Sequence, residues 1–467
     1  MMHFMIFRLL VPAFLLFLSG YCLGQNSPVA ALAYHQQPTQ VRIYYDSLPG
    51  RLKEELYVLI DTCEVLHGPY TKYYPNGKVT AHGVFRYGKK DSTFTEYYEN
   101  GNKKIEVGYK NDLKHGSLLA YSEKGIVVQE GRYENDQLKD HFKTYYSNGK
   151  PRLEGQFVNG RPEGLVKEYY SNGKLKEEMN YLNNKLEGTG KTYYESGVLH
   201  TEAQYKNGAL SGTMKNYHPN GKLHIEYYNE DGRKKGYSRT FTDQEVLILE
   251  SLFKNGVLDG ETKSYYESGS LKQRINYRNG IKAGTSQSYY PNGKPKETVL
   301  YSNNAQDREV QAFFPDGKLS GLSTYEANKP TGTWKYFYET GPLKREETYK
   351  LGKLEGKRLT YHEYGSLQSE EWFVNGKLEG LIRTYYPIEA PVTSANKLAS
   401  APVGKVKTEE TFVKGLRNGP YKSYFPQGKI ESAGLYRNDK QHGKWNFFDD
   451  KSKIIQTLNF KYGVKQN

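Results

Sequence analysis

The chain has 467 residues and a formal net charge of +14, and its composition excludes both a large globular core and a disordered chain. Only 36% of the residues are hydrophobic, which is too few for a large core, whereas 44 tyrosines exceed what disordered chains contain. Because tyrosine is amphipathic and favours strands, this composition suits a thin β-sheet that is wet on both faces.

The first 24 residues have the pattern of a secretory signal peptide. A positive charge precedes an apolar run over residues 9–18, and Cys-Leu-Gly at 22–24 places small residues before a cleavage site. The run is too short for a transmembrane helix. A lipid anchor at Cys22 fits less well, because bulky Tyr21 precedes it. We therefore expect an exported chain that is periplasmic, outer-surface or secreted.

Composition divides the rest of the chain into three parts. Residues 25–40 read as a flexible leader, and residues 41–67 as a degenerate repeat that caps an array, as terminal repeats do. The array itself covers residues 68–467. A Pro/Ala/Ser-rich insertion at 387–403 interrupts it, and a long loop in a strict array is a candidate for function.

The array repeats every 24 residues. A turn glycine marks the period, with Glu245 and Ser452 as replacements and one shift of 15 residues at the insertion. The glycines are at 77, 101, 125, 149, 173, 197, 221, 269, 293, 317, 341, 365, 404 and 428. Sixteen units in this register indicate a repeat protein, whose length is set by unit number and not by domain size.

Other columns of the repeat are equally regular. The position four before the turn glycine is always aromatic, as in Tyr73, and the position eight after it is aromatic except at Asn229. A second glycine precedes the Tyr-Tyr strand, and Ser92, Asp140 and Arg308 interrupt that column. Two β-favouring runs separated by Asn-Gly signals describe a β-hairpin. The sequence predicts an all-β fold, an elongated single-layer antiparallel meander of about 16 repeated β-hairpins.

The register of the hairpin follows from proline. Residue 75 and its equivalents are often proline, which has no N–H for a two-residue turn, so a type I turn followed by a glycine bulge fits better. This register pairs Tyr73 with Val79. Strand alternation would then place Tyr73, Val79 and Phe85 on one apolar face. An uncovered row of such residues would favour a homodimer.

The opposite face should carry the second tyrosine, a basic column and an acidic column. Its plainest interpretation is a solvated face with cross-strand ion pairs, and the alternative is a binding surface. The candidate binding residues are Tyr146, Tyr170, Tyr194, Arg152, Lys176, Lys272, Lys296 and Lys344.

These columns resemble the MORN repeat, in the variant found in bacterial proteins of the YwqK-like antitoxin type. The Tyr-Tyr-x-Asn-Gly-Lys strand-turn carries the resemblance, together with turns such as Asn438-Asp-Lys-Gln-His442-Gly443. The resemblance covers roughly residues 65–463. It implies a long, twisted single-layer sheet and a scaffolding or binding role without catalysis.

No nucleophile elbow, P-loop or HExxH motif occurs in the sequence. His200, His218 and His224 lack a second type of ligand, so we expect no metal and no cofactor. Nucleic acid is disfavoured, because acids are interleaved with the basic residues and an export signal is present.

Two functions remain open. The first is an exported, non-enzymatic scaffold that binds a protein, a membrane surface or an envelope polymer through its repeated Tyr/Lys surface. The second is an antitoxin- or immunity-like protein that captures a single toxin partner.

Overall fold

The computed structural model describes residues 37–60, 64–388 and 402–466, which fall into two units divided between Asn184 and Lys185. The predicted signal peptide, most of the predicted leader and the middle of the insertion lie outside the described residues. The first strand begins at Thr39, so its first two residues fall within the predicted leader.

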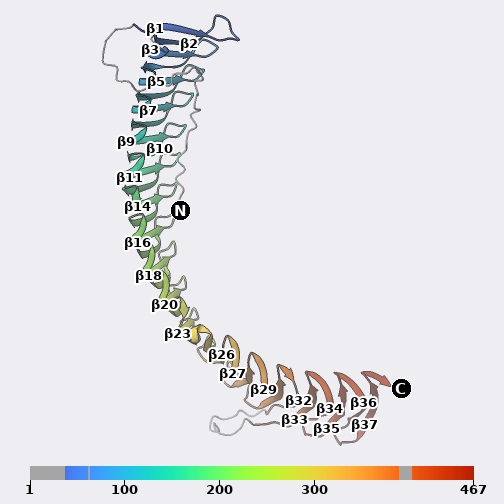
Figure 1. The fold of residues 1–467 in the computed structure, drawn as a ribbon. Helices are drawn as coiled ribbons and strands as arrows, with labels where there is room; N and C mark the ends of the chain where they lie inside the picture. Colours follow the sequence, from blue (N-terminus) through green and yellow to red (C-terminus); the bar gives the residue numbers. More distant parts are fainter. Residues whose placement is uncertain (1–36, 61–63, 389–401, 467) are drawn as a thin grey trace. The chain divides into compact units, whose positions relative to one another are not determined.

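Unit 1 contains twelve strands among its described residues, stacked side by side in one layer (Figure 1). They are β1 Thr39–Tyr44, β2 Leu52–Ile60, β3 Glu64–Tyr73, β4 Val79–Arg86, β5 Lys89–Tyr97, β6 Lys103–Lys110, β7 Leu113–Tyr121, β8 Val127–Glu134, β9 Gln137–Tyr145, β10 Pro151–Val158, β11 Arg161–Tyr169 and β12 Leu175–Leu182.

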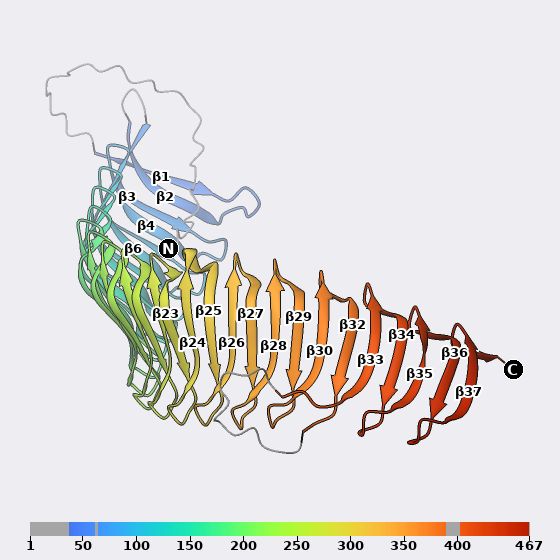
Figure 2. The ribbon, with the colours of Figure 1, turned by 90° about the horizontal axis from the view of Figure 1, so that it is seen from below.

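Unit 2 continues the same pattern, and Figure 2 shows its later strands as a row that alternates in direction. They are β13 Lys185–Leu186, β14 Gly188–Tyr193, β15 Leu199–Lys206, β16 Ala209–Tyr217, β17 Leu223–Glu230, β18 Arg233–Phe241, β19 Leu247–Lys254, β20 Val257–Tyr265, β21 Leu271–Arg278, β22 Ile281–Lys282, β23 Gly284–Tyr289, β24 Pro295–Ser302, the 3-10 turn η1 Asn303–Ala305, β25 Asp307–Phe313, β26 Leu319–Glu326, β27 Lys329–Phe337, β28 Leu343–Lys350, β29 Lys353–Tyr361, β30 Leu367–Val374, β31 Lys377–Leu378, β32 Gly380–Tyr385, β33 Val406–Val413, β34 Leu416–Tyr424, β35 Ile430–Arg437, β36 Lys440–Phe448, β37 Ile454–Lys461 and β38 Val464–Gln466.

Within each unit the strands form an open antiparallel meander, in which neighbours in sequence are neighbours in the sheet. The prediction of an all-β meander of repeated hairpins is therefore confirmed. No helix among the described residues has the length and apolar character needed to cross a membrane.

The turn at each repeat is the bulged turn that proline predicted. Tyr73 pairs with Val79. The Gly77 N–H donates to the Tyr74 carbonyl at 2.9 Å, and the Tyr74 N–H donates to the carbonyl of Lys78 at 2.8 Å. Gly77 has φ +85°, a left-handed conformation that glycine adopts without the strain a side chain would bring.

The prediction that Tyr73, Val79 and Phe85 share one face is wrong. Phe85 pairs with Gly68, five residues from Tyr73, so strand alternation puts Phe85 and Tyr73 on opposite faces. The cause is a second bulge. Lys72 pairs with Ala81 while Tyr73 pairs with Val79, so Thr80 has no partner on the other strand. Beyond this bulge the side chains of β4 point to the opposite face from the one that simple alternation predicts.

The Phe85 side of the sheet, which we call the aromatic face, holds most of the buried apolar side chains, and a smaller buried cluster of Tyr361, Leu367 and Tyr385 lies on the other side. Its rings contact one another in series: Tyr70–Phe85 at 5.4 Å, Phe85–Phe94 at 5.2 Å and Phe94–Tyr109 at 5.6 Å between centroids. Phe85 and Phe94 are each only 7% exposed. The chain itself covers this column, so the uncovered row that motivated the homodimer is not present here, and the homodimer stays a prediction.

The second glycine column makes a further bulge in every other strand. Val107 pairs with Leu118 and Tyr109 with Lys114, so β7 has two residues more than β6 between these pairs. Gly116, in this bulge, has φ +96°. A Cβ on Gly108 opposite would lie 2.2 Å from the carbonyl oxygen of His115, which no side chain could tolerate.

One repeat places the two additional residues of this bulge differently. Arg308 replaces the second glycine, and the pairing of β24 with β25 runs without a bulge from Glu297↔Ala312 to Ser302↔Asp307. The surplus residues instead form a four-residue turn that contains η1. The repeat therefore keeps its period by moving the irregularity from the strand to the turn.

The insertion begins and ends on the neighbouring hairpin. The Leu367 N–H donates to the Pro402 carbonyl at 3.0 Å, and the Ile388 N–H donates to Ser366 Oγ at 3.3 Å. Ser366 is fully buried. Both described ends of the predicted 387–403 loop are thus fixed to the turn before β30.

Candidate functional site

The second tyrosine of each 24-residue repeat joins one hairpin to the next. The Tyr146 hydroxyl donates to the Tyr169 carbonyl at 2.7 Å, and the Tyr194 hydroxyl donates to the Tyr217 carbonyl at 2.8 Å. Tyr170 occupies the same position in its own unit and is half-buried. The same bond is made by Tyr74, Tyr98, Tyr266, Tyr290, Tyr338 and Tyr386. The hydroxyls of these candidate residues are therefore engaged, and their rings remain half-exposed.

The basic column lies over those rings. The Nζ atoms of Lys272 and Lys296 lie 5.6 and 5.9 Å from the ring centroids of Tyr266 and Tyr290. Such contacts contribute about 0.5–1 kcal/mol each at exposed sites. Four pairs in unit 2 have this geometry, and we call them the Tyr/Lys stripe: Tyr266/Lys272, Tyr290/Lys296, Tyr338/Lys344 and Tyr386/Lys407.

The four stripe lysines are exposed, and among the described residues none lies within 4.0 Å of a carboxylate oxygen. In unit 1 the corresponding lysine, Lys176, differs. Lys176 Nζ donates to Glu168 at 2.9 Å, and this bond raises the pKa of Lys176. Arg152 is exposed. The structure therefore separates the predicted basic candidates into neutralised and unneutralised groups.

The sequence contains a signal for these Tyr/Lys pairs that becomes visible only when the tyrosine and lysine columns are compared with each other. A basic residue follows the second tyrosine by six positions at most units, for example Tyr146 with Arg152, and Tyr74 with Thr80 is an exception. Where the tyrosine is replaced, the basic residue is replaced too: Ser122/Val128, Thr242/Ile248, Phe314/Ser320 and Phe425/Glu431. Where both residues are present in unit 2, the structure brings the lysine over the tyrosine ring.

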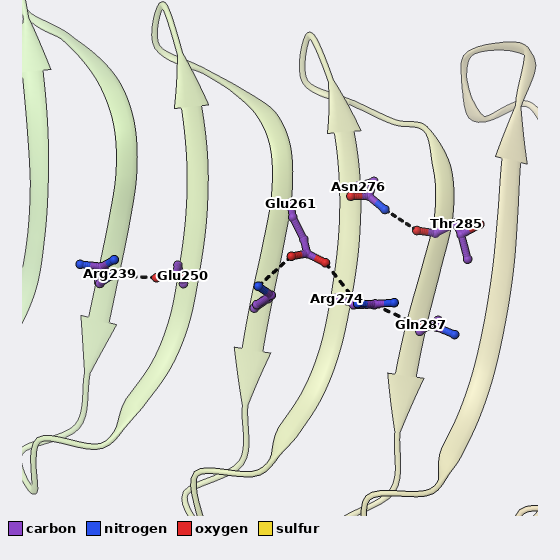
Figure 3. A network of polar contacts seen from close by, with 8 residues as sticks. Arg239, Glu250, Glu261, Arg274, Asn276, Thr285 and Gln287 are labelled. Carbon is purple, nitrogen blue, oxygen red and sulfur yellow. Dashed lines mark hydrogen bonds and ion pairs between the residues drawn. The ribbon is translucent and has the colours of Figure 1, made fainter.

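The other side of the sheet, which we call the ladder face, carries the acidic column and a second basic column. Figure 3 shows Arg239 paired with Glu250, whose carboxylate lies 2.7 Å from Nε. The Nη1 of Arg239 also lies 3.4 Å from Glu226 on the preceding strand. Glu261 lies 2.8 Å from Lys263 and 3.7 Å from Arg274. The bond to Glu250 raises the pKa of Arg239. Most of these pairs are solvent-exposed and individually weak.

The first tyrosine column also lies on the ladder face. The hydroxyls of Tyr145 and Tyr169 donate to Glu130 at 2.8 Å and Glu154 at 2.5 Å. Burial, and then these bonds, raise the pKa of both tyrosines to about 12. Acidic side chains on this face are thus hydrogen-bonded structural groups.

The histidines form contacts of the same kind. His218 and His224 lie with ring centroids 4.2 Å apart, where other units have Tyr and Lys, and His218 Nε2 lies 3.0 Å from the Phe241 carbonyl oxygen. Burial and the neighbouring His218 lower the pKa of His224. In the described part of the chain, no three His, Cys, Asp or Glu side chains are grouped so that they could hold a metal ion.

Comparison with known proteins identifies the repeat. The family described as MORN repeat variant matches ten stretches. They are residues 66–86, 90–111, 141–159, 162–183, 186–207, 210–232, 258–279, 282–303, 330–351 and 417–438. No curated protein matches the chain.

Among solved structures, the chain is similar at 11% identity to a chain of the TcdB2-TccC3-Cdc42 crystal structure, with a TM-score of 0.16, over 91% of this chain and 26% of that one. A chain of the Photorhabdus luminescens Tc holotoxin pore gives 10% identity and a TM-score of 0.15, over 91% of this chain and 30% of that one. This chain therefore spans less than a third of the length of either. Stretches that match the MORN repeat variant therefore occur in both units, and they share the hairpin period and the bulged turn.

Proposed function

We propose that the protein is an exported, non-enzymatic scaffold that binds an extended anionic surface through the Tyr/Lys stripe. The observation that carries this proposal is the contrast between two lysine populations. Lysines of the ladder face lie beside carboxylates, as Lys143 does beside Glu154 at 3.8 Å. The stripe lysines are held in place by tyrosine rings, which leave their charge uncompensated.

The spacing of the stripe suits a partner with many equivalent negative groups. Consecutive units are two strands apart, so Lys272 and Lys296 lie about 10 Å from each other by strand spacing. Each lysine near an anionic membrane surface contributes about 1 kcal/mol. Single contacts would be weak, and several together would give useful affinity through multivalency.

The test replaces the stripe lysines together, as Lys272→Gln, Lys296→Gln, Lys344→Gln and Lys407→Gln. The control makes the same charge change on the ladder face, with Lys143→Gln, Lys191→Gln, Lys335→Gln and Lys357→Gln, whose amines lie beside glutamates. Binding is measured to vesicles that contain phosphatidylglycerol and to dextran sulfate beads, at low and high salt.

We expect the stripe variant to bind on the order of a thousandfold more weakly, at about 1 kcal/mol for each of the four lysines, and the control variant to bind nearly as the parent does. Binding should also weaken as salt rises, because exposed charges are screened. Equal losses in both variants would mean that net charge, and not the stripe, is responsible. Binding that resists salt and maps to one segment would favour capture of a single toxin-like partner.

Export is a separate part of the proposal and rests on the signal pattern of residues 1–24. Fractionation of cells that carry a C-terminally tagged chain should find it outside the cytoplasm, shortened at its N-terminus. A full-length cytoplasmic chain would remove this part and leave the stripe unaffected.

A further inference from the structure

Unit 1 has a hollow on its ladder face that the scaffold function does not use. It measures about 550 Å³ and opens over strands β7 to β10. Four of its residues, Ser117, Arg132, His141 and Gln156, come one from each strand. Ser117 pairs with Arg132 and His141 with Gln156, whereas Arg132 pairs with Lys139 across a bulge that contains Asp140 and His141. Ligand pockets commonly have volumes of this size.

Three residues of the hollow depart from their repeat columns. Arg132 is the only basic residue at the position seven after the turn glycine, where other repeats have Asn, Gln, Thr, Leu, Val, Gly or an aromatic residue. His141 is the only histidine in its column. Because the other repeats fold without Arg132 or His141 at these positions, folding alone does not explain why these two side chains are present.

Asp140 is the third departure. It replaces the second glycine and keeps that residue's left-handed backbone, with φ +62°. A side chain in this conformation costs of order 1–3 kcal/mol and persists where its surroundings require it. Asp140 also lines the hollow. A strained residue and two unusual residues therefore meet at one place.

The charged groups around the hollow are unequally engaged. Glu130 accepts a hydrogen bond from Tyr145 at 2.8 Å, and Lys143 lies 3.8 Å from Glu154. No carboxylate of the described residues lies within 4.0 Å of the Arg132 guanidinium, which is exposed at the edge of the hollow. The guanidinium presents a planar set of donors that matches the geometry of an oxyanion.

We propose that this hollow binds a small molecule through an oxyanion group, a carboxylate or a phosphate. Arg132 binds the oxyanion, His141 and Gln156 add donors from the neighbouring strands, and Asp140 accepts from a hydroxyl or amine of the same molecule. The site lies on the ladder face of unit 1, whereas the stripe lysines belong to unit 2. The inference does not rest on the proposed function.

The experiment measures dissociation constants of the full chain for three probes by isothermal titration calorimetry: inorganic phosphate, glucuronate and glucose. Glucuronate and glucose share their hydroxyls, and only glucuronate has a carboxylate. We expect at least one of the two anions to bind and glucose to bind at least tenfold more weakly. Phosphate alone or glucuronate alone would identify the oxyanion. Failure of both anions at 50 mM, or equal binding of glucose, would overturn the proposal.

Variants connect the binding to the hollow. Arg132→Ala should weaken the bound anion at least tenfold, and Arg278→Ala, an exposed arginine elsewhere, should leave it unchanged. His141→Ala should weaken it several-fold. Asp140→Gly restores the repeat residue, so folding is expected to be at least as stable, and the preference for glucuronate over phosphate should fall. Equal affinity in Arg132→Ala and in the parent would refute the assignment.

Discussion

Glu245 occupies a turn position at which the neighbouring units have Gly221 and Gly269. Its backbone has φ +66°, and its N–H still donates to the Thr242 carbonyl at 3.0 Å. Lys222 Nζ lies 3.7 Å from its carboxylate in an exposed pair, which compensates little. The turn therefore keeps its left-handed backbone and its hydrogen bond even though glutamate disfavours this conformation.

We predict that Glu245→Gly raises the free energy of unfolding by about 1 kcal/mol, because it removes left-handed strain from a side chain. Gly269→Ala should lower it by about as much, although a Cβ there would meet no atom within 4 Å. Urea denaturation of the three proteins checks both changes. A destabilised Glu245→Gly protein would show that the side chain contributes more than the strain costs.

At the same scale, the bulged turn was predictable because Pro75 lacks a donor and the following glycine accepts the left-handed conformation. The second bulge, opposite Tyr73, was not predictable. It requires neither glycine nor proline, and ordinary residues such as Thr80 occupy it. Local residue preferences determine turns, whereas this bulge arises from how whole strands pair.

Among elements, consecutive hairpins are linked by the second tyrosine as well as by strand pairing. Histidine can replace it, since His218 and His362 approach the equivalent carbonyls at 3.0 and 3.3 Å. The hydrogen bond between hairpins thus requires a polar side-chain atom at the position of the tyrosine hydroxyl. Phenylalanine, with the same ring, would lack it.

We predict that Tyr266→Phe lowers the free energy of unfolding by about 1 kcal/mol, since the Tyr289 carbonyl loses the hydroxyl that donates at 2.8 Å. The contact of the ring with Lys272 should survive. Tyr237→Phe is the matched control, because that ring is exposed and its hydroxyl has no hydrogen bond to any of the described residues. Thermal denaturation distinguishes them, and equal effects would exclude the hairpin link.

The candidate surface was predictable at this scale only in part. The tyrosine and lysine columns were visible as columns, and their contact follows from a register that the sequence supplied through proline. What the columns could not show was which lysines have carboxylate neighbours, because Glu168 and Lys176 meet across strands. Nor could they show that Arg132 and His141, nine residues apart, share a hollow.

At the scale of the whole molecule, the period alone predicted the fold, because a repeat of one hairpin with one register propagates without long-range information. The net charge of +14 is distributed unevenly by this fold. On the ladder face the basic and acidic columns compensate each other's charge. The uncompensated positive charge lies on the lysines of the Tyr/Lys stripe, which follow the bulged turns. Departures from the period, such as the Arg132 hollow, are where the repeat gives no guidance.

The same regularity makes the molecule respond to alkali through many equivalent tyrosines. The pKa values of Tyr145, Tyr169 and Tyr424 are raised to about 12, by burial and then by bonds to glutamates. In the unfolded chain tyrosine loses its proton near pH 10. Between pH 10 and 12 the folded chain therefore holds more protons than the unfolded chain, and stability falls as pH rises.

We predict that the melting temperature is level between pH 8 and 9.5 and falls steeply by pH 11. Lysines also lose charge in this range, so a variant must separate the two causes. Tyr145→Phe, Tyr169→Phe and Tyr424→Phe together keep every lysine and remove three raised hydroxyls, and they should reduce the fall while lowering stability at pH 8. An unchanged fall in this variant would assign alkaline unfolding to the lysines, and the buried hydroxyl–carboxylate bonds would then not set the pH limit of the array.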